Sequence, residues 1–217
     1  MLPDLILPAL LMEAATFALN EGQTAEPILY GVTDGKAVGT YLEQKFRRYL
    51  QGRYTFADGN SAEGIDLPGL LVDIKTTSAK QPQSSCPFKS ARQKVYGLGY
   101  NLLVFVYIKT DDAAAQSARL DIRNTIFVHA AQTADYQTTF GLRRLLQSNA
   151  NTDDIVAFLQ ERMLPVDEIA AVVLAEEILA NPPLQGYLTI SNALQWRLQY
   201  SRVITEAGAV AGVERVR

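Results

Sequence analysis

A short apolar run in the first half of the chain carries charges that packing alone does not explain. Residues 70–74 read Leu-Leu-Val-Asp-Ile, a β-prone run, and Lys75 follows directly. Side chains on a strand alternate between its two faces, so Asp73 and Lys75 should point to the same face, about 7 Å apart. We therefore expect a strand here that presents an acid and an amine side by side.

A second acid is expected to approach this strand through a turn. Asp66 is separated from the strand by Leu67-Pro68-Gly69, and Pro followed by Gly favours a tight turn. Two converging carboxylates repel each other unless a cation lies between them, and Mg²⁺ accepts a few carboxylates while it keeps water and phosphate oxygens as its other ligands. An amine beside such a metal can orient the attacking water or neutralise charge on a phosphate. The pattern indicates phosphodiester hydrolysis.

The order Asp66, Asp73, Lys75 resembles the core motif of the PD-(D/E)xK nuclease superfamily: an acid, a variable gap, Asp or Glu, any residue, and Lys. The gap and the run Val-Asp-Ile-Lys-Thr-Thr are most similar to the branch that holds the mismatch-repair nicking nuclease MutH and related type II restriction endonucleases. Asp73 stands where that branch has Glu, and Ile65 replaces the Pro of the motif. The resemblance covers residues 36 to 109, approximately.

The resemblance implies roles for these residues. Asp66, Asp73 and the backbone carbonyl of Ile74 would hold Mg²⁺, for which Mn²⁺ can substitute, and Lys75 would act on the attacking water. Products would carry 5′-phosphate and 3′-hydroxyl ends.

Glu43 is expected to support this site. Residues 39–43 read Gly-Thr-Tyr-Leu-Glu and look like the segment in which MutH-like nucleases carry a glutamate near the metal, on the preceding helix. The alternative is a surface ion pair between Glu43 and Arg47, four residues further along the same helix.

Basic residues gather around the motif although the net charge of the chain is −3. Ten of the 20 lysines and arginines lie between residues 45 and 109. Such a stripe is typical of a surface that holds a phosphate backbone, and solvated helix faces are the alternative. The residues expected to contact DNA are Lys80, Gln81, Lys89, Arg92, Gln93 and Lys94 in or beside this stripe, and Gln195, Arg197 and Arg202 near the end of the chain.

Three segments carry these residues. Residues 78–87 are polar and should form a loop along a DNA groove or an ordinary surface loop. Gln93 resembles the Gln-x-x-Tyr element of some superfamily members, whereas Lys94 resembles a basic residue of MutH-like enzymes, and the choice stays open. Residues 191–201 predict a capped helix that either reads DNA within a helix-turn-helix or winged-helix element or packs an interface.

The periodicity of the whole chain predicts an α/β fold. We expect a restriction-endonuclease-like core over residues 1–135, in which helices flank a mixed central sheet, and a mainly helical C-terminal region over residues 136–217. The helices of the core are expected at residues 8–20, 39–50 and 90–99, and the strands at 101–109 and 118–129.

Composition excludes several other classes. The single Cys86, in a segment that reads as loop, excludes an internal disulfide, and the single His129 excludes a histidine cluster for a transition metal. The apolar run at residues 5–11 is too short to span a bilayer and lacks the basic start of a signal peptide. We expect a cytoplasmic protein with no membrane partner.

These observations together predict a Mg²⁺-dependent endonuclease that cuts double-stranded DNA, most like a type II restriction enzyme. One site per chain implies a homodimer, and such an enzyme would work beside a cognate DNA methyltransferase. A repair or recombination nuclease that nicks DNA or recognises its structure is the first alternative. A catalytically inactive DNA- or partner-binding module is the second.

Overall fold

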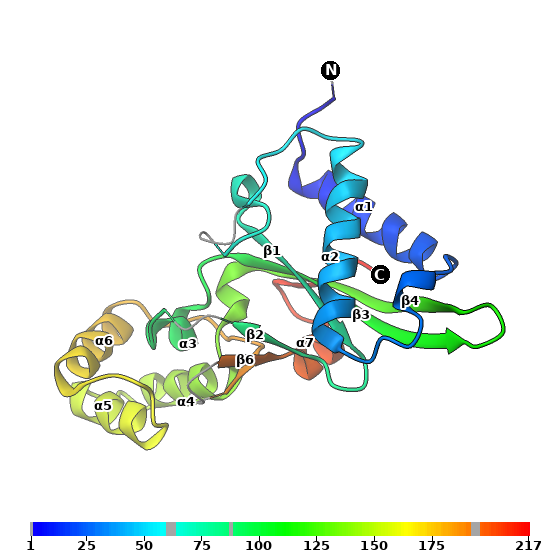
Figure 1. The fold of residues 1–217 in the computed structure, drawn as a ribbon. Coiled ribbons are helices and arrows are strands. Elements are labelled where there is room, and N and C mark those ends of the chain that lie inside the picture. Colours follow the sequence, from blue (N-terminus) through cyan, green and yellow to red (C-terminus); the bar gives the residue numbers. More distant parts are fainter. Residues whose placement is uncertain (1, 60–63, 87–88, 192–195) are drawn as a thin grey trace.

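Two long strands, β3 (Asn101–Asp112) and β4 (Ser117–Val128), form the centre of a mixed sheet (Figure 1). β1 (Val72–Ser78) pairs with β3 in parallel, and β7 (Val213–Arg215) pairs with β4 in antiparallel orientation. The order is β1-β3-β4-β7, so β1 lies at an edge. This computed structural model describes residues 2–59, 64–86, 89–191 and 196–217. The predicted mixed sheet flanked by helices is confirmed.

Two long helices cover one face of the sheet. They are α1 (Leu7–Glu21) and α2 (Gly35–Gln51), and α2 is capped by Asp34, whose side chain accepts a hydrogen bond from the backbone of Lys36. Leu42 and Phe46 recur at helical spacing on α2 and are fully buried, and the rings of Phe46 and Phe105 lie 5.0 Å apart. The apolar stripe of α2 belongs to the same buried cluster as Val72 and Ile74 of β1 and Leu103 and Phe105 of β3, so this packing fixes α2 against the sheet.

A smaller sheet covers the other face. It contains β2 (Gln83–Cys86), β6 (Trp196–Gln199) and β5 (Thr189–Ile190) in the order β2-β6-β5, and α7 (Ser201–Glu206) follows it. Leu102 and Val104 of β3 pack here, whereas the alternate residues Leu103 and Phe105 face α1 and α2. The near-continuous apolar run of β3 therefore reflects a central strand that is buried on both faces.

A third apolar cluster holds together four helices, which lie at the lower left of Figure 1. These are α3 (Arg92–Tyr96), α4 (Tyr136–Gln147), α5 (Thr152–Glu161) and α6 (Glu168–Ala180). Asp135 caps α4, at the boundary that the sequence predicts between two regions. That division stays a prediction. Short 3₁₀ helices lie at Pro27–Leu29 (η1), Pro68–Leu70 (η2) and Ala130–Thr133 (η3).

The helix predicted over residues 191–201 is wrong. Arg197 and Gln199 are exposed while Leu198 and Tyr200 are buried, which is the period of a strand, and β6 forms there by pairing with β2. The segment predicted as the recognition helix of a helix-turn-helix element therefore contains a strand at residues 196–199. Gln195 lies outside the described residues.

The loop predicted over residues 78–87 is also partly wrong, because its second half forms β2. Cys86 is a buried strand residue there. Ser84 and Ser85 weaken the local strand signal, and the pairing partner lies more than a hundred residues later in the sequence. Within the described residues, no helix is long and apolar enough to cross a membrane.

Candidate active site

Two carboxylates occupy the open edge of β1. Pairing with β3 uses one edge of this strand, and the backbone N–H groups of Ile74 and Thr76 point away from it. Asp66 Oδ2 accepts the Ile74 N–H at 2.9 Å, and Glu43 Oε1 accepts the Thr76 N–H at 3.1 Å. Glu43 also accepts the Thr76 hydroxyl at 2.7 Å. The carboxylates thus take the place that a neighbouring strand would fill.

The predicted turn is what brings Asp66 to this edge. Pro68–Leu70 forms the 3₁₀ helix η2, and the backbones of Leu67 and Val72 exchange hydrogen bonds of 2.9 and 3.2 Å across it. Leu71 closes the turn with φ of 50°, a left-handed conformation that is uncommon for a residue with a side chain. The chain therefore doubles back directly after Asp66, whose carboxylate then lies beside β1.

Asp73 and Lys75 share one face of β1, as strand alternation predicts. Lys75 Nζ lies 2.7 Å from Asp73 Oδ2, and their side chains are 22% and 5% exposed. Ile74 points to the opposite face and packs under α1 and α2. The structure thus brings Asp66, Asp73, Lys75 and Glu43 together along the edge strand.

Burial dominates the electrostatics of this cluster. It raises the pKa of Asp73 to about 7, and the neighbouring Asp66 adds to the rise while Lys75 opposes it. Burial also raises the pKa of Glu43, against the hydrogen bond from Thr76. For Lys75, burial lowers the pKa, but Asp73, Glu43 and Asp66 together outweigh it, so the net shift is upward. The amine therefore stays protonated at neutral pH.

Sequence reasoning missed the contact of Arg47 with Asp66, because it considered Arg47 as one residue of the basic stripe and as a surface partner of Glu43. Glu43 turns to Thr76 instead, and Arg47 Nη1 lies 3.5 Å from Asp66 Oδ1. A second nitrogen of Arg47 contacts Asp58 at 3.0 Å. The available signal was its position one helical turn after Glu43, which places it over the same edge of the sheet.

The donor set fits a hard divalent ion. Asp66 and Asp73 supply carboxylate oxygens, and the carbonyl of Ile74 points to the same edge as its N–H group. Within the described residues, no three His, Cys, Asp or Glu side chains gather into a metal site. Two carboxylates and a carbonyl suit Mg²⁺, which is commonly bound through one or two carboxylates and keeps water and phosphate oxygens as its other ligands.

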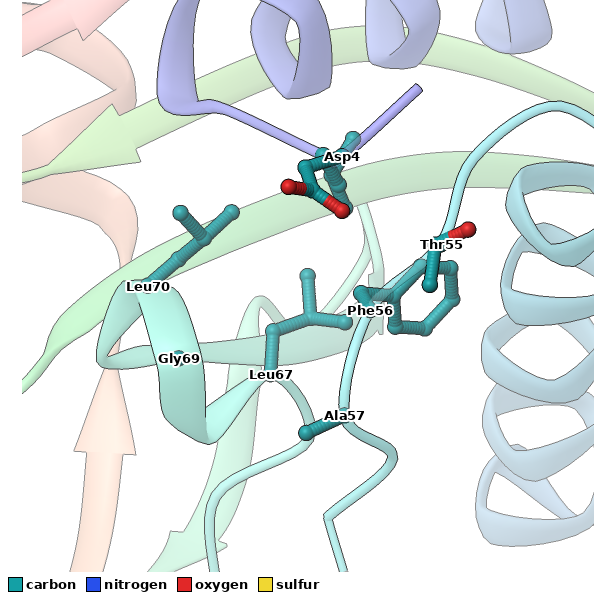
Figure 2. A pocket seen from close by; sticks show the side chains of 8 residues that line it. Asp4, Thr55, Phe56, Ala57, Leu67, Gly69 and Leu70 are labelled. Atoms are coloured by element: carbon teal, nitrogen blue, oxygen red, sulfur yellow. The ribbon is translucent and has the colours of Figure 1, made fainter. Parts of the chain in front are cut away.

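A separate pocket of about 420 Å³ opens behind the turn (Figure 2). In Figure 2, Asp4 lines it from above, Phe56 from the right, Leu70 from the left and Leu67 from below. None of the four charged residues of the candidate site lines it. The pocket therefore supports no part of the chemistry proposed for the edge strand.

The predicted DNA-contacting residues near the motif divide into exposed and buried groups. Lys80, Gln81 and Lys89 are exposed. Arg92 is exposed as well, but its guanidinium is paired with Glu177 of α6 at 2.6 Å.

Gln93 and Lys94 are both buried. Gln93 donates to the carbonyl of Leu98 at 3.3 Å and accepts the N–H of Lys89 at 3.2 Å, so its amide supports the local backbone. Burial lowers the pKa of Lys94, and the carboxylate of Asp135 offsets part of this shift. A direct role of either residue at the phosphate stays a prediction.

The two C-terminal arginines lie in different surroundings. Arg197 is exposed on β6, whereas the guanidinium of Arg202 stacks 3.6 Å from the centre of the Tyr136 ring. Their contacts with DNA stay predictions.

The mixed sheet with flanking helices is consistent with a restriction-endonuclease-like fold. Comparison with known proteins gives the family. The family model described as type II restriction enzyme NspV matches residues 4–215. The type II restriction enzyme NspV of Nostoc sp. (strain ATCC 29411 / PCC 7524) is 62% identical over 209 residues, which cover 96% of this chain and 95% of that protein.

The chain therefore belongs to the family of the type II restriction enzyme NspV. The prediction of a type II restriction endonuclease, a site-specific deoxyribonuclease, is confirmed. No solved structure matches the chain.

Proposed function

We propose that this restriction endonuclease hydrolyses phosphodiester bonds of double-stranded DNA with Mg²⁺ held by Asp66, Asp73 and the carbonyl of Ile74. The observation that carries the proposal is the Asp73–Lys75 pair, 2.7 Å apart on an edge strand, with Asp66 beside it on the Ile74 N–H. Type II restriction enzymes generally need a divalent metal ion, and Mn²⁺ has the same preference for oxygen ligands. Bound Mg²⁺ supplies positive charge that neutralises the phosphate and eases deprotonation of the attacking water.

Lys75 is the residue best placed to act on the water and the phosphate. Its raised pKa keeps it protonated, so its ammonium group donates hydrogen bonds and cannot serve as the base in this state. If Asp73 held a metal ion, less of its charge would be available to Lys75. The ammonium then orients the attacking water and stabilises negative charge as it builds on the phosphate.

Glu43 and Asp66 keep the edge strand in position. Each carboxylate accepts a backbone N–H of β1, so a shift of the strand would break both hydrogen bonds. Glu43 is therefore a positioning residue that acts through Thr76. Arg47 neutralises Asp66 in the metal-free protein, since their charged groups lie 3.5 Å apart.

Cleavage of both strands needs two such sites. The described chain contains one, so we propose a homodimer whose two-fold axis matches a symmetric target sequence. A cognate DNA methyltransferase would protect the same sequence in the DNA of the cell. A nicking monomer would serve repair instead, and the family favours the restriction enzyme.

Digestion of a plasmid tests the proposal. The purified protein and Mg²⁺ should convert supercoiled plasmid to discrete linear fragments, whose sequenced ends share one short sequence and carry 5′-phosphates. Asp121→Asn is a matched control, because Asp121 is an ion-paired acid on β4 outside the proposed site. Open circles without linear product would point to a nicking enzyme, and no cleavage with either metal ion would contradict the proposal.

A further inference from the structure

The small sheet β2-β6-β5 has two different faces. Its inner face is apolar or hydroxyl-bearing and buried, and it contains Cys86, Leu198, Tyr200 and Ile190, which pack against the central sheet. The hydroxyl groups of Ser84 and Tyr200 are hydrogen-bonded to each other at 2.5 Å on this side. The inner face thus anchors the sheet and leaves the outer face to the solvent.

The outer face presents polar side chains in register. Gln199 lies opposite Gln83 on one side and Thr189 on the other, and Arg197 lies opposite Ser85. Opposite residues of an antiparallel pair have Cβ atoms about 4.5–5.5 Å apart, so the two glutamines and the arginine form one compact group. Ser85, Arg197 and Gln199 are exposed, and Gln83 is half-buried.

These side chains are available to a ligand. Within the described residues, the side chains of Gln83, Ser85, Arg197 and Gln199 make no hydrogen bond or ion pair with the rest of the chain. The three strands contain no Asp or Glu that would repel a phosphate backbone. The backbone that carries Arg197 is fixed, because its N–H is donated to Ser191 Oγ at 2.9 Å.

The chemistry of this group suits base edges in duplex DNA. A glutamine amide can form two hydrogen bonds with adenine, and an arginine guanidinium can form two with guanine, both in the major groove. That groove is wide enough for a two-stranded β-ribbon, and β2 and β6 form such an antiparallel pair, with only the two-residue strand β5 beside β6.

The outer face is also fixed to the catalytic strand. Thr77 lies two residues beyond Lys75 on β1, and its Oγ1 accepts the N–H of Gln83 at 2.9 Å. The N–H of Tyr200, directly after β6, is donated to the carbonyl of Pro82 at 2.8 Å. A displacement of the β2–β6 ribbon by a base contact would therefore also shift Thr77 and, with it, the neighbouring Lys75.

We propose that the outer face of β2 and β6, formed by Gln83, Arg197 and Gln199, enters the major groove and reads the bases of the target sequence. This inference rests on the proposed DNA cleavage. It places Arg197 and Gln199 on a ribbon, not on the helix that the sequence predicts, and it adds Gln83, which lies opposite Gln199.

The test is cleavage of a plasmid library that carries a randomised segment, with the cut ends sequenced. The wild-type protein should give one consensus. Gln83→Ala, Gln199→Ala and Arg197→Ala should each reduce the preference at a particular base position by roughly ten- to a hundredfold and leave the other positions intact. Arg197→Lys keeps the charge but loses the paired geometry, so it should relax the same position as Arg197→Ala.

Matched controls come from exposed residues elsewhere. Gln147→Ala on α4 and Arg119→Ala on β4 remove the same side chains at sites remote in sequence from the ribbon, and both should keep the wild-type consensus. Sedimentation of each ribbon variant is run alongside.

The outcomes separate this inference from the proposed function. If the wild-type protein cuts no DNA, the proposed function fails first. If the wild type gives a consensus and the ribbon variants keep it while they cut all sites more slowly, the reading role is contradicted. A variant that changes from dimer to monomer with an unchanged consensus would also overturn it, and would identify the ribbon as a subunit interface.

Discussion

The open edge of β1 and the outer face of the β2–β6 ribbon are both polar, but they differ in what their side chains contact. At the edge, Asp66 and Glu43 hold backbone N–H groups and Asp73 holds Lys75. On the ribbon, Gln199 and Arg197 lack such partners within the described residues. Catalytic groups are thus fixed before the substrate arrives, whereas the groups we assign to sequence reading are left for the bases. Substitutions at the edge should change the rate, and substitutions on the ribbon should change the preference.

The largest effect is expected from Asp73→Ala. It removes a proposed metal ligand, so cleavage should fall below about one per cent of wild type, a barrier increase above about 2.7 kcal/mol. Specific DNA binding in Ca²⁺ should persist, because the ribbon is unchanged. The rate of plasmid linearisation and a binding assay measure the two properties separately, with Asp121→Ala as the control. Cleavage above about one per cent of the wild-type rate would show that Asp73 is not a metal ligand.

Lys75→Ala should reduce turnover by about a hundredfold to ten-thousandfold while the metal still binds. The amine acts on water and phosphate, and its loss leaves Asp73 more available to the ion. Calorimetric titration with Mn²⁺ checks the binding and single-turnover cleavage checks the rate. If the variant no longer binds the ion, Lys75 has a structural role in the site and the assigned division between Asp73 and Lys75 is wrong.

A smaller effect is expected from Glu43→Gln. The amide oxygen can still accept from Thr76, but the negative charge near Lys75 and Asp66 is lost, so kcat should fall about ten- to a hundredfold, as for other groups that support a metal ligand. Sequence preference should not change. Glu43→Ala removes the acceptor altogether, and Thr76→Val removes the hydroxyl donor and keeps the backbone N–H, so the effects of these two substitutions should overlap in the double variant. Fully additive effects would show that Glu43 acts independently of Thr76.

The last effect concerns stability, not activity, in the absence of metal. The pKa of Asp73 is raised from 3.8 to about 7 in the folded protein. At a pH between these two values, the folded state therefore keeps a proton on Asp73 that the unfolded chain has lost. Stability is therefore lost as the pH rises toward 7, and wild type should lose about 2–3 kcal/mol more than Asp73→Asn between about pH 5 and pH 8. Urea unfolding in EDTA at both pH values measures this difference. Equal losses in the two proteins would show that Asp73 is ionised throughout.

The sequence predicted the parts of the site that are local. Asp73 and Lys75 follow from strand alternation, and Asp66 follows from a turn coded by Pro and Gly. The contact between Glu43 and Thr76 depends on how α2 packs across β1, so the sequence predicted that Glu43 supports the site but not that Thr76 is its partner.

The β2–β6 ribbon was beyond local reasoning. The segment that contains Arg197 can be read as helix or strand from its own residues, and pairing with β2 decides the choice. Ser84 and Ser85 have low strand propensity, and their partner is distant in the sequence. Tertiary context therefore overrode the local signal in this region.

Binding of Mn²⁺ to wild type and to the Asp66→Asn/Asp73→Asn double variant tests the central claim most directly, because it depends on neither the target sequence nor the oligomeric state. Calorimetry should show that wild type binds the ion, that Mg²⁺ competes for it, and that the double variant, folded by circular dichroism, has lost this binding. Equal binding by the two proteins would contradict the claim that the carboxylates at the edge of β1 hold the catalytic metal.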